Sequence, residues 1–180
     1  MKSVLISVQP KWCELIASGK KTVEVRKTRP KVDTPFKVYI YCTQGKPTLG
    51  RCLKDNSLKA TDETDFDNYN RDTLFRANGK VIGEFVCDAI YDCRDVNMDD
   101  TCLTVDEWLK YTQGHKGVVY GWHISDLVIY DKPKDLSEFH PHCNHADYCT
   151  ECKNYDFDTK DCRRIKRPPH SWCYVERSEG

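Results

Sequence analysis

Gly19-Lys-Lys-Thr-Val-Glu-Val-Arg26 is the stretch from which we predict the fold of this 180-residue chain. It follows residues 10–18, whose apolar side chains recur at helical spacing, and glycine is the residue type that most often ends a helix. Residues 22–26 then alternate apolar and polar side chains, as a strand does. The stretch therefore predicts a short helix, a glycine stop and a strand in direct succession.

The charged residues of this stretch have two possible arrangements. In a strand, Glu24 and Arg26 lie on one face and Val23 and Val25 on the other. Lys21 precedes the strand at a helix C-terminus, where a cation is electrostatically favoured and where its long side chain can reach the same side. The three charges either converge on one hollow or form a surface ion-pair row, which contributes at most about 1 kcal/mol.

The same residues resemble the signature of the ASCH domain, a small barrel of the PUA-like superfamily. In that signature a short helix is followed by Gly-x-Lys-x-x-Glu-x-Arg, and the four defined positions are filled here by Gly19, Lys21, Glu24 and Arg26. Residues 80–85 resemble the family's central strand, and residues 167–175 resemble the close of some bacterial and phage members. The resemblance implies an α+β fold, a small PUA-like β-barrel with short flanking helices.

Length and charge favour one domain with insertions. A chain of 180 residues can bury one core without help from metals. Lys plus Arg equals Asp plus Glu at 28 each, but residues 1–31 hold eight basic and two acidic residues, whereas residues 55–72 hold six acidic and two basic ones. We therefore expect a positive patch near the amino terminus, which suits a phosphate-bearing partner such as RNA or DNA.

Hydropathy and cysteine usage indicate a cytoplasmic protein. No apolar run approaches the roughly 20 residues needed to span a bilayer, and residues 1–8 are too short for a signal-peptide core. The 11 cysteines are an odd number and do not space out as a disulfide framework. We expect most of them to be reduced, buried thiols.

The barrel is predicted to occupy residues 1–139. Strands are expected at 3–8, 36–42, 80–91 and 118–124, and Thr104 with Glu107 predicts a capping box at the start of a helix. Residues 43–79 are polar, acidic and aperiodic, so we expect an insertion with little regular structure, or a mobile lid. Trp12 lies on the apolar face of the first helix, where a core position is the default and base stacking the alternative.

Residues 140–162 have a different character and predict a zinc-knuckle insertion. They are almost without apolar residues, so burial cannot order them. A Cys-x-x-Cys turn brings two thiolates to one ion, and a closed structural zinc site follows if four cysteines contribute: Cys143, Cys149, Cys152 and Cys162. Three alternatives stay open, namely a histidine in place of Cys143, an iron–sulfur cluster, or a redox-active cysteine pair.

Residues 163–180 are predicted to form a basic loop and the last barrel strand. Arg163, Arg164 and Arg167 precede Trp172. Cations followed by an aromatic side chain suit phosphates and bases, although a solvated loop that leads into a strand has the same composition.

The resemblance implies a cleft beside the signature that meets RNA, DNA or a nucleotide. We expect a binding function, in which Lys21 and Arg26 contact phosphate or base edges and Glu24 orients them. Replacing either cation by alanine is then expected to weaken binding with little loss of thermal stability. The composition does not indicate the oligomeric state.

The alternative function is catalytic. The chain is similar to the small bacterial ASCH amidohydrolases that remove the acyl group from N4-acetylcytidine with a lysine, a threonine three residues later and a distant glutamate. Lys21 matches that lysine, but Glu24 occupies the threonine position. Lys21 and Glu24 could still activate a water molecule, with Glu84 or Glu107 as the distant carboxylate.

Overall fold

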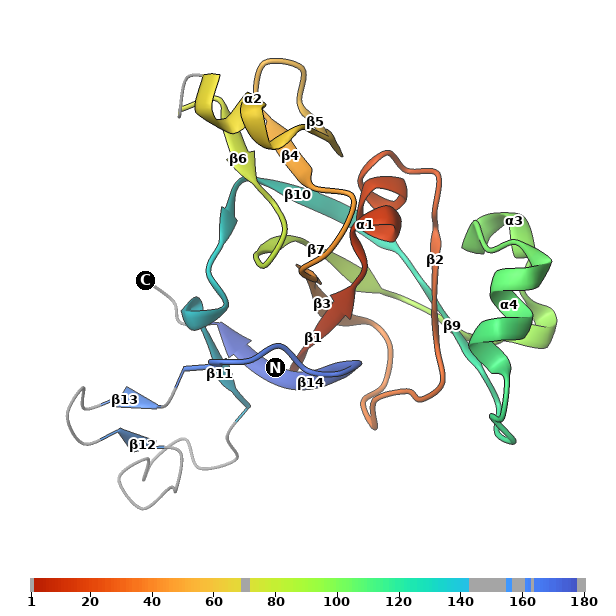
Figure 1. The fold of residues 1–180 in the computed structure, drawn as a ribbon. Coiled ribbons are helices and arrows are strands. Elements are labelled where there is room, and N and C mark those ends of the chain that lie inside the picture. The colour runs from red at the N-terminus through yellow and green to blue at the C-terminus, as the bar shows by residue number, and fades with distance from the viewer. Residues whose placement is uncertain (1, 69–71, 143–154, 157–160, 163, 178–180) are drawn as a thin grey trace.

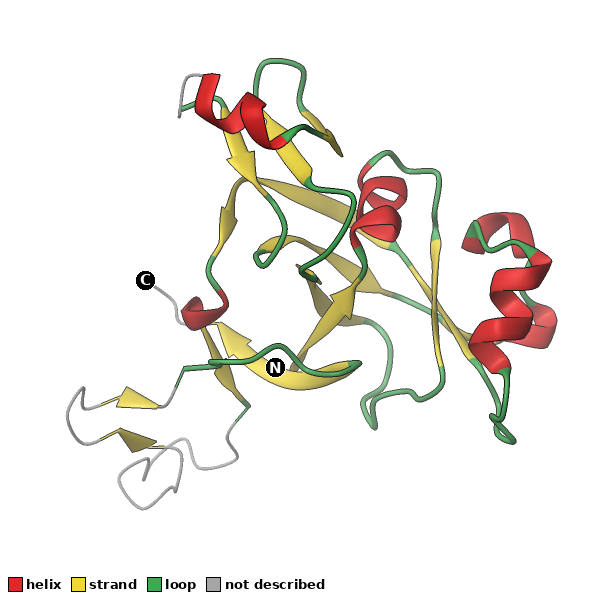
Figure 2. Cartoon of the chain, viewed as in Figure 1, coloured by secondary structure: helices red, strands yellow, loops and turns green. Residues whose placement is uncertain are grey.

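The computed structural model describes residues 2–68, 72–142, 155–156, 161–162 and 164–177. Sheets dominate this part of the chain and the helices are short, as Figures 1 and 2 show. The α+β class expected from the sequence is confirmed.

The largest sheet has six strands. They are β1 (Ser3–Val8), β3 (Phe36–Cys42), β7 (Val81–Cys87), β10 (Ser125–Lys134), β11 (Phe139–Pro141) and β14 (Trp172–Arg177). Their order across the sheet is β10-β7-β3-β1-β14-β11. Only the β1–β3 pair is parallel, and the other four pairs are antiparallel.

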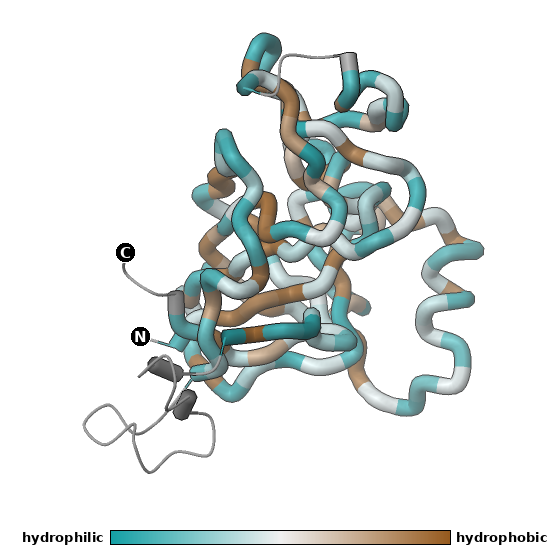
Figure 3. Tube along the Cα trace, turned by 60° about the vertical axis from the view of Figure 1, so that its left-hand side comes forward, coloured by the Kyte–Doolittle hydropathy of each residue, from teal (hydrophilic) through white to brown (hydrophobic). Residues whose placement is uncertain are grey.

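The two central strands of this sheet bury side chains on both faces. Ile6 and Ile40 enter one apolar cluster, whereas Leu5 and Tyr39 enter another. Tyr39 packs edge-on against Phe139, with ring centroids 4.9 Å apart. Full burial of one such side chain contributes about 1.5–3 kcal/mol. Burial on both faces is consistent with the hydrophobic segments that run through the middle of the molecule in Figure 3.

A second sheet packs on the first through side chains. It consists of β2 (Val23–Arg26), β9 (Tyr120–His123) and β8 (Ile90–Asp92), in the order β2-β9-β8. Trp122 of β9 is fully buried, and its ring meets Phe36 of β3 at 5.9 Å and 81°. No sheet closes on itself within the described ranges, where β10 and β11 are the edges of the large sheet. The expected closed barrel is therefore not shown, because side-chain packing and not a ring of hydrogen bonds joins the two sheets.

The predicted helix–glycine–strand junction is present. The first helix is α1 (Pro10–Ala17), and Gly19 follows it with a φ of +74°, a left-handed conformation in which a side chain would be strained. The backbone N–H groups of Lys20 and Lys21 both donate to the carbonyl oxygen of Leu15 at 3.0 Å. This closure of the helix end sends Lys21 directly into the start of β2.

Residues 43–79 contain more regular structure than expected. They form β4 (Leu49–Cys52), β5 (Ser57–Ala60), α2 (Glu63–Asn68) and β6 (Leu74–Arg76), and the strands pair in the order β5-β4-β6. Leu49 and Leu58 belong to the main apolar cluster, and the Asn78 side chain accepts a hydrogen bond from the Leu49 N–H at 2.7 Å. The prediction of little regular structure is wrong because a few well-placed leucines anchor an otherwise polar segment.

The predicted strand at 80–91 is divided between β7 and β8. A Cβ atom at Gly83 would lie only 2.3 Å from the Val128 carbonyl oxygen of β10, so the backbones of β7 and β10 approach closely where Gly83 has no side chain. The chain then leaves the large sheet and enters the second one.

Short helices complete the described fold. They are η1 (Cys93–Asp95), α3 (Met98–Thr101), α4 (Val105–Thr112) and η2 (Leu136–Glu138), and the strands β12 (Tyr155–Asp156) and β13 (Asp161–Cys162) pair with each other. Thr104 and Glu107 form the predicted capping box of α4. Within the described part of the chain, no helix combines the length and the apolar content that crossing a bilayer requires.

Candidate functional site

A cavity of about 590 Å³ lies beside the signature stretch. Lys21, Glu24 and Arg26 all line it, so the convergent arrangement is the one that forms. The rest of its wall comes from Ser7, Val8, Gln9, Trp12, Val25, Lys27, Thr28, Thr43, Leu103, Tyr111, His170 and Ser171. Small-molecule sites typically enclose about 300–1,000 Å³, so the cavity has the size of a ligand site.

The three charged residues are buried and paired. Their exposed fractions are 3% for Lys21, 6% for Glu24 and 7% for Arg26, which excludes a surface ion-pair row. The Glu24 carboxylate lies between the two cations, with Oε2 at 3.5 Å from Lys21 Nζ and Oε1 at 2.8 Å from Arg26 Nη2. The cluster carries one net positive charge in a desolvated setting, where electrostatic interactions are stronger than in water.

Lys21 is fixed by backbone carbonyl groups. Its Nζ donates to Val23 O and to Thr101 O, both at 2.7 Å. Thr101 ends α3, so this short helix positions the ammonium group. The same Nζ lies 5.3 Å from the centroid of the Trp12 ring. An ammonium group has three N–H donors, and the third remains for Glu24 or for a ligand.

Arg26 joins three separate segments of the chain. Its Nη2 donates to Ser7 O in β1 at 2.8 Å, and its Nη1 donates to Ser171 O at 3.2 Å and Ser171 Oγ at 3.3 Å. The buried Nε has no hydrogen-bond partner among the described residues. Because most donors of the guanidinium are engaged within the protein, Arg26 holds the cavity wall together. The expectation that its replacement costs little stability is therefore not supported by its surroundings.

Two aromatic side chains supply flat surfaces in the wall. Trp12 is half-buried, and Lys11 Nζ lies 4.3 Å from its ring centroid. Tyr111 donates its hydroxyl to Val25 O at 3.3 Å, and Lys27 Nζ lies 5.1 Å from its ring centroid. Burial raises the pKa of Tyr111 above its usual value, so the hydroxyl stays protonated at neutral pH. Trp12 thus combines a packing role with a face toward the cavity.

Neither candidate for the distant carboxylate lines this cavity. Glu84 of β7 accepts hydrogen bonds from Lys37 Nζ at 2.6 Å and from the Tyr130 hydroxyl on the large sheet. Glu107 caps its own helix and pairs with Lys11 Nζ at 2.5 Å. The lysine and the Thr104 N–H hold the pKa of Glu107 at about 2. Glu24 is the carboxylate that the described cavity wall contains.

The basic residues predicted before β14 are separated. Arg163 lies outside the described residues, Arg164 Nη1 lies 2.6 Å from His140 Nε2, and Arg167 is exposed. None of them lines the cavity as the structure describes it.

Trp172 contacts the wall of the cavity without lining the cavity itself. Its Nε1 donates to Thr28 Oγ1 at 2.9 Å, and its ring lies 6.2 Å from Trp122 in the core. Thr28 lines the cavity, whereas Trp172 does not. The structure therefore places Trp172 next to the site as a packing residue.

Several wall residues were not predicted from the sequence. Ser7, Thr43 and Ser171 bring hydroxyl groups from three distant segments, and Tyr111 and His170 add rings. Ser171 belongs to residues 167–175, which resemble family members, but only the pairing of β1 with β3 and β14 brings the three hydroxyl residues together.

The predicted zinc ligands cannot be assembled from the described residues. Cys143, Cys149 and Cys152 lie outside them, and Cys162 is placed by its backbone in β13. In the part that is described, no group of three His, Cys, Asp or Glu side chains is suited to hold a metal ion. The zinc site stays a prediction.

Comparisons with known proteins identify the fold. The family model of the ASCH domain matches residues 6–160. The crystal structure of ASCH from Zymomonas mobilis (ZmASCH) is 19% identical with a TM-score of 0.51, and the alignment covers 98% of this chain and 89% of that one. A serine-to-alanine variant of ZmASCH is 18% identical with a TM-score of 0.56, at 97% and 88% coverage. No curated protein matches the sequence. At these identities, the structural likeness is one of fold.

Proposed function

The chain belongs to the ASCH domain family, and from this premise we propose that its cavity binds a nucleobase, carried by RNA, by DNA or by a free, modified nucleoside. The observation that carries the proposal is the burial of Lys21, Glu24 and Arg26 around one hollow of ligand size. Proteins bury charges at a cost, and such clusters concentrate at functional sites.

The chemistry of the wall matches a nucleobase. A base has a flat π-face and an edge of hydrogen-bond donors and acceptors, and aromatic stacking contributes about 1–3 kcal/mol per base. Trp12 offers the flat surface, while Lys21 and the hydroxyl of Thr43 offer polar groups. The net positive charge of the cluster favours a ligand that carries a phosphate.

The proposal is tested with Trp12→Leu. Leucine preserves apolar packing on α1 but removes the stacking face, so we expect cytidine or a short oligocytidylate to bind roughly 5- to 150-fold more weakly, measured by calorimetry. Trp108→Leu is the matched control, because Trp108 is also half-buried but does not line the cavity. Equal affinity of both variants and the unmodified protein would exclude this cavity as the base site.

The catalytic alternative uses the same cavity. For an N4-acylated cytidine, Glu24 would take a proton from water, the resulting hydroxide would attack the acyl carbon, and Lys21 would stabilise the oxyanion. The bond between the acyl carbon and N4 would then break, and Glu24 would pass its proton to N4, which releases cytidine and the carboxylic acid. Both oxygens of Glu24 are already engaged by Lys21 and Arg26, which favours binding over catalysis. Incubation with N4-acetylcytidine is expected to release no cytidine. If cytidine is released by the unmodified protein but not by Glu24→Gln, catalysis and not binding alone would be the favoured function.

We also propose that residues 140–162 hold a structural zinc ion through Cys143, Cys149, Cys152 and Cys162. The β12–β13 pair supports the proposal, because it sets Cys162 opposite Tyr155, three residues after Cys152. Elemental analysis is expected to find a single zinc ion per chain. Cys149→Ser with Cys152→Ser should lose it, while Cys102→Ser with Cys173→Ser, two free thiols elsewhere, should retain it.

A cytoplasmic location forms part of the proposal. The free cysteines among the described residues number seven, and five of them are buried. Burial raises the pKa of Cys87 to about 12 and that of Cys93 to about 11, so these thiols stay protonated. Reduced thiols in such number suit a reducing compartment.

A further inference from the structure

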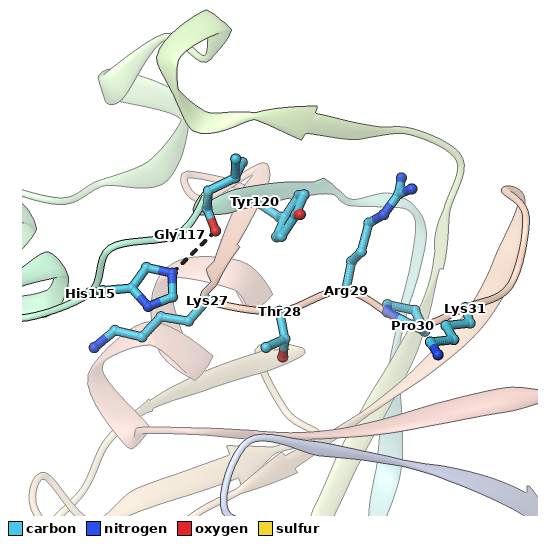
Figure 4. Close-up of a pocket in the computed structure, with 9 residues that line it drawn as sticks. Lys27, Thr28, Arg29, Pro30, Lys31, His115, Gly117 and Tyr120 are labelled. Carbon is cyan, nitrogen blue, oxygen red and sulfur yellow. Dashed lines mark hydrogen bonds between the residues drawn. The ribbon is translucent and has the colours of Figure 1, made fainter.

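A second cavity adjoins the first. It measures about 570 Å³ and lies between the loop that follows β2 and the residues that lead into β9. Figure 4 shows Lys27, Arg29 and Lys31 spread along that loop, with His115 and Tyr120 on the opposite wall. Lys27 and Thr28 line both cavities, so the two cavities are neighbours at these residues.

The second cavity is strongly basic. Three of its lining residues are Lys27, Arg29 and Lys31, and no described lining residue is acidic. None of these three cations forms an ion pair with any residue that the structure describes, in contrast to Lys21 and Arg26. Arg29 and Lys31 are exposed, and Lys27 is half-buried. Positive charge that is not neutralised internally attracts an anion.

The backbone of the loop is held in place although its cations are exposed. Pro30 is buried, the Lys31 N–H donates to the Tyr174 hydroxyl at 2.7 Å, and Thr28 Oγ1 accepts from Trp172 Nε1 at 2.9 Å. These anchors come from β14, the last strand of the large sheet. A fixed loop presents its cations without the entropy cost of ordering a flexible one.

The opposite wall is also defined. His115 Nε2 lies 3.3 Å from Val118 O, the contact drawn as a dashed line in Figure 4, and Tyr120 belongs to β9. The Arg29 guanidinium lies 5.8 Å from the centroid of the Tyr120 ring. An arginine next to an aromatic face is a surface on which a nucleotide can rest.

We propose that this second cavity holds the phosphates of a single-stranded nucleic acid whose base occupies the first cavity. The inference rests on the proposed function and names its ligand as a strand and not a free nucleoside. A base can enter the first cavity only when it is unstacked and unpaired, as in single strands and loops. The phosphates that flank this base then lie over Lys27, Arg29 and Lys31. Because phosphate contacts do not depend on the sugar, we expect RNA and DNA strands both to bind.

The test is the double variant Arg29→Gln with Lys31→Gln. Both side chains are exposed, and glutamine keeps polarity while it removes charge. Oligocytidylate and oligodeoxycytidylate are titrated at several salt concentrations, and cytidine is titrated alongside. We expect roughly tenfold weaker oligonucleotide binding at low salt, a slope of log affinity against log salt that is smaller by about 1.4, and unchanged cytidine binding.

A matched control removes two charges elsewhere. Lys54→Gln with Lys59→Gln alters exposed lysines of the β4–β5 hairpin, at the opposite end of the molecule from the basic loop (Figure 1). This control should bind the oligonucleotides like the unmodified protein.

The outcomes separate this inference from the proposed function. If the unmodified protein binds cytidine but binds the oligonucleotides no more tightly, the strand proposal fails and the base site stands. An unchanged salt slope in Arg29→Gln with Lys31→Gln also overturns the strand proposal. If neither cytidine nor any oligonucleotide binds, both proposals fail together.

Discussion

Two groups of cations lie within 11 consecutive residues of this chain, and their surroundings are opposite. Lys21 and Arg26 are buried, paired with Glu24 and hydrogen-bonded to backbone carbonyl groups. Arg29 and Lys31 are exposed and have no ion-pair partner among the described residues. The comparison teaches that the buried cations maintain the shape of a cavity, while the exposed cations are available to a ligand.

We expect the largest difference between the two groups when the loss in free energy of unfolding caused by Arg26→Ala is compared with the loss caused by Arg29→Ala. Removing the Arg26 guanidinium leaves the buried Glu24 with one partner and breaks the link to Ser7 and Ser171. Breaking a buried pair costs about 3–5 kcal/mol, whereas an exposed substitution changes stability by no more than about 0.5 kcal/mol. Urea unfolding measures both variants. Equal stability of the two would show that Arg26 does not hold the cavity wall.

Lys21→Met tests the other buried cation. Methionine retains much of the apolar stem but leaves Val23 O and Thr101 O without their donor, so we expect a loss of about 2–3 kcal/mol in the free energy of unfolding. Lys27→Met is the control, since Lys27 is half-buried and lines the same cavity. An equally large loss of stability in Lys27→Met would contradict the account, because it would show that the deeper burial of Lys21 does not give it a greater structural role than Lys27.

The smallest effect is expected from the exposed pair between Lys11 and Glu107, which links α1 to α4 at 2.5 Å. The pKa of Glu107 in the folded protein is lowered to about 2 from an ordinary value near 4.5. The stabilisation is therefore complete above about pH 4.5 and is lost as the pH falls through about 2. Glutamine can still cap the helix, so Glu107→Gln isolates the charge.

Unfolding of the unmodified protein and Glu107→Gln should differ by at most about 1 kcal/mol at neutral pH, because solvent screens the exposed pair. The difference should shrink on acidification. A difference that persists at pH 2 would mean that Glu107 contributes through its shape and not through its charge.

Local patterns predicted much of the site. The order of helix, glycine and strand placed Lys21, Glu24 and Arg26 correctly relative to one another, because helix closure at Gly19 and strand alternation are both local effects. The capping box that assigned Glu107 to its own helix is equally local.

Features that depend on contacts between residues far apart in the sequence could not be predicted from local patterns. Burial of the charge cluster depends on Ser171 and Thr101, which are far from it in sequence. The small sheet within residues 43–79 was missed because its average composition is polar, although Leu49 and Leu58 sit where the core needs them. Glu84 and Glu107 remained equivalent candidates until the fold placed both outside the cavity wall.

The central claim is that the cavity lined by Lys21, Glu24 and Arg26 receives a base while the loop at 27–31 receives phosphates. An NMR titration of isotope-labelled protein with oligocytidylate tests it most directly. We predict that the Trp12 indole N–H and the backbone amides of the loop shift together, while the amides of the distant β4–β5 hairpin stay unchanged. Shifts confined to that hairpin, with the Trp12 signal unmoved at saturation, would contradict the account.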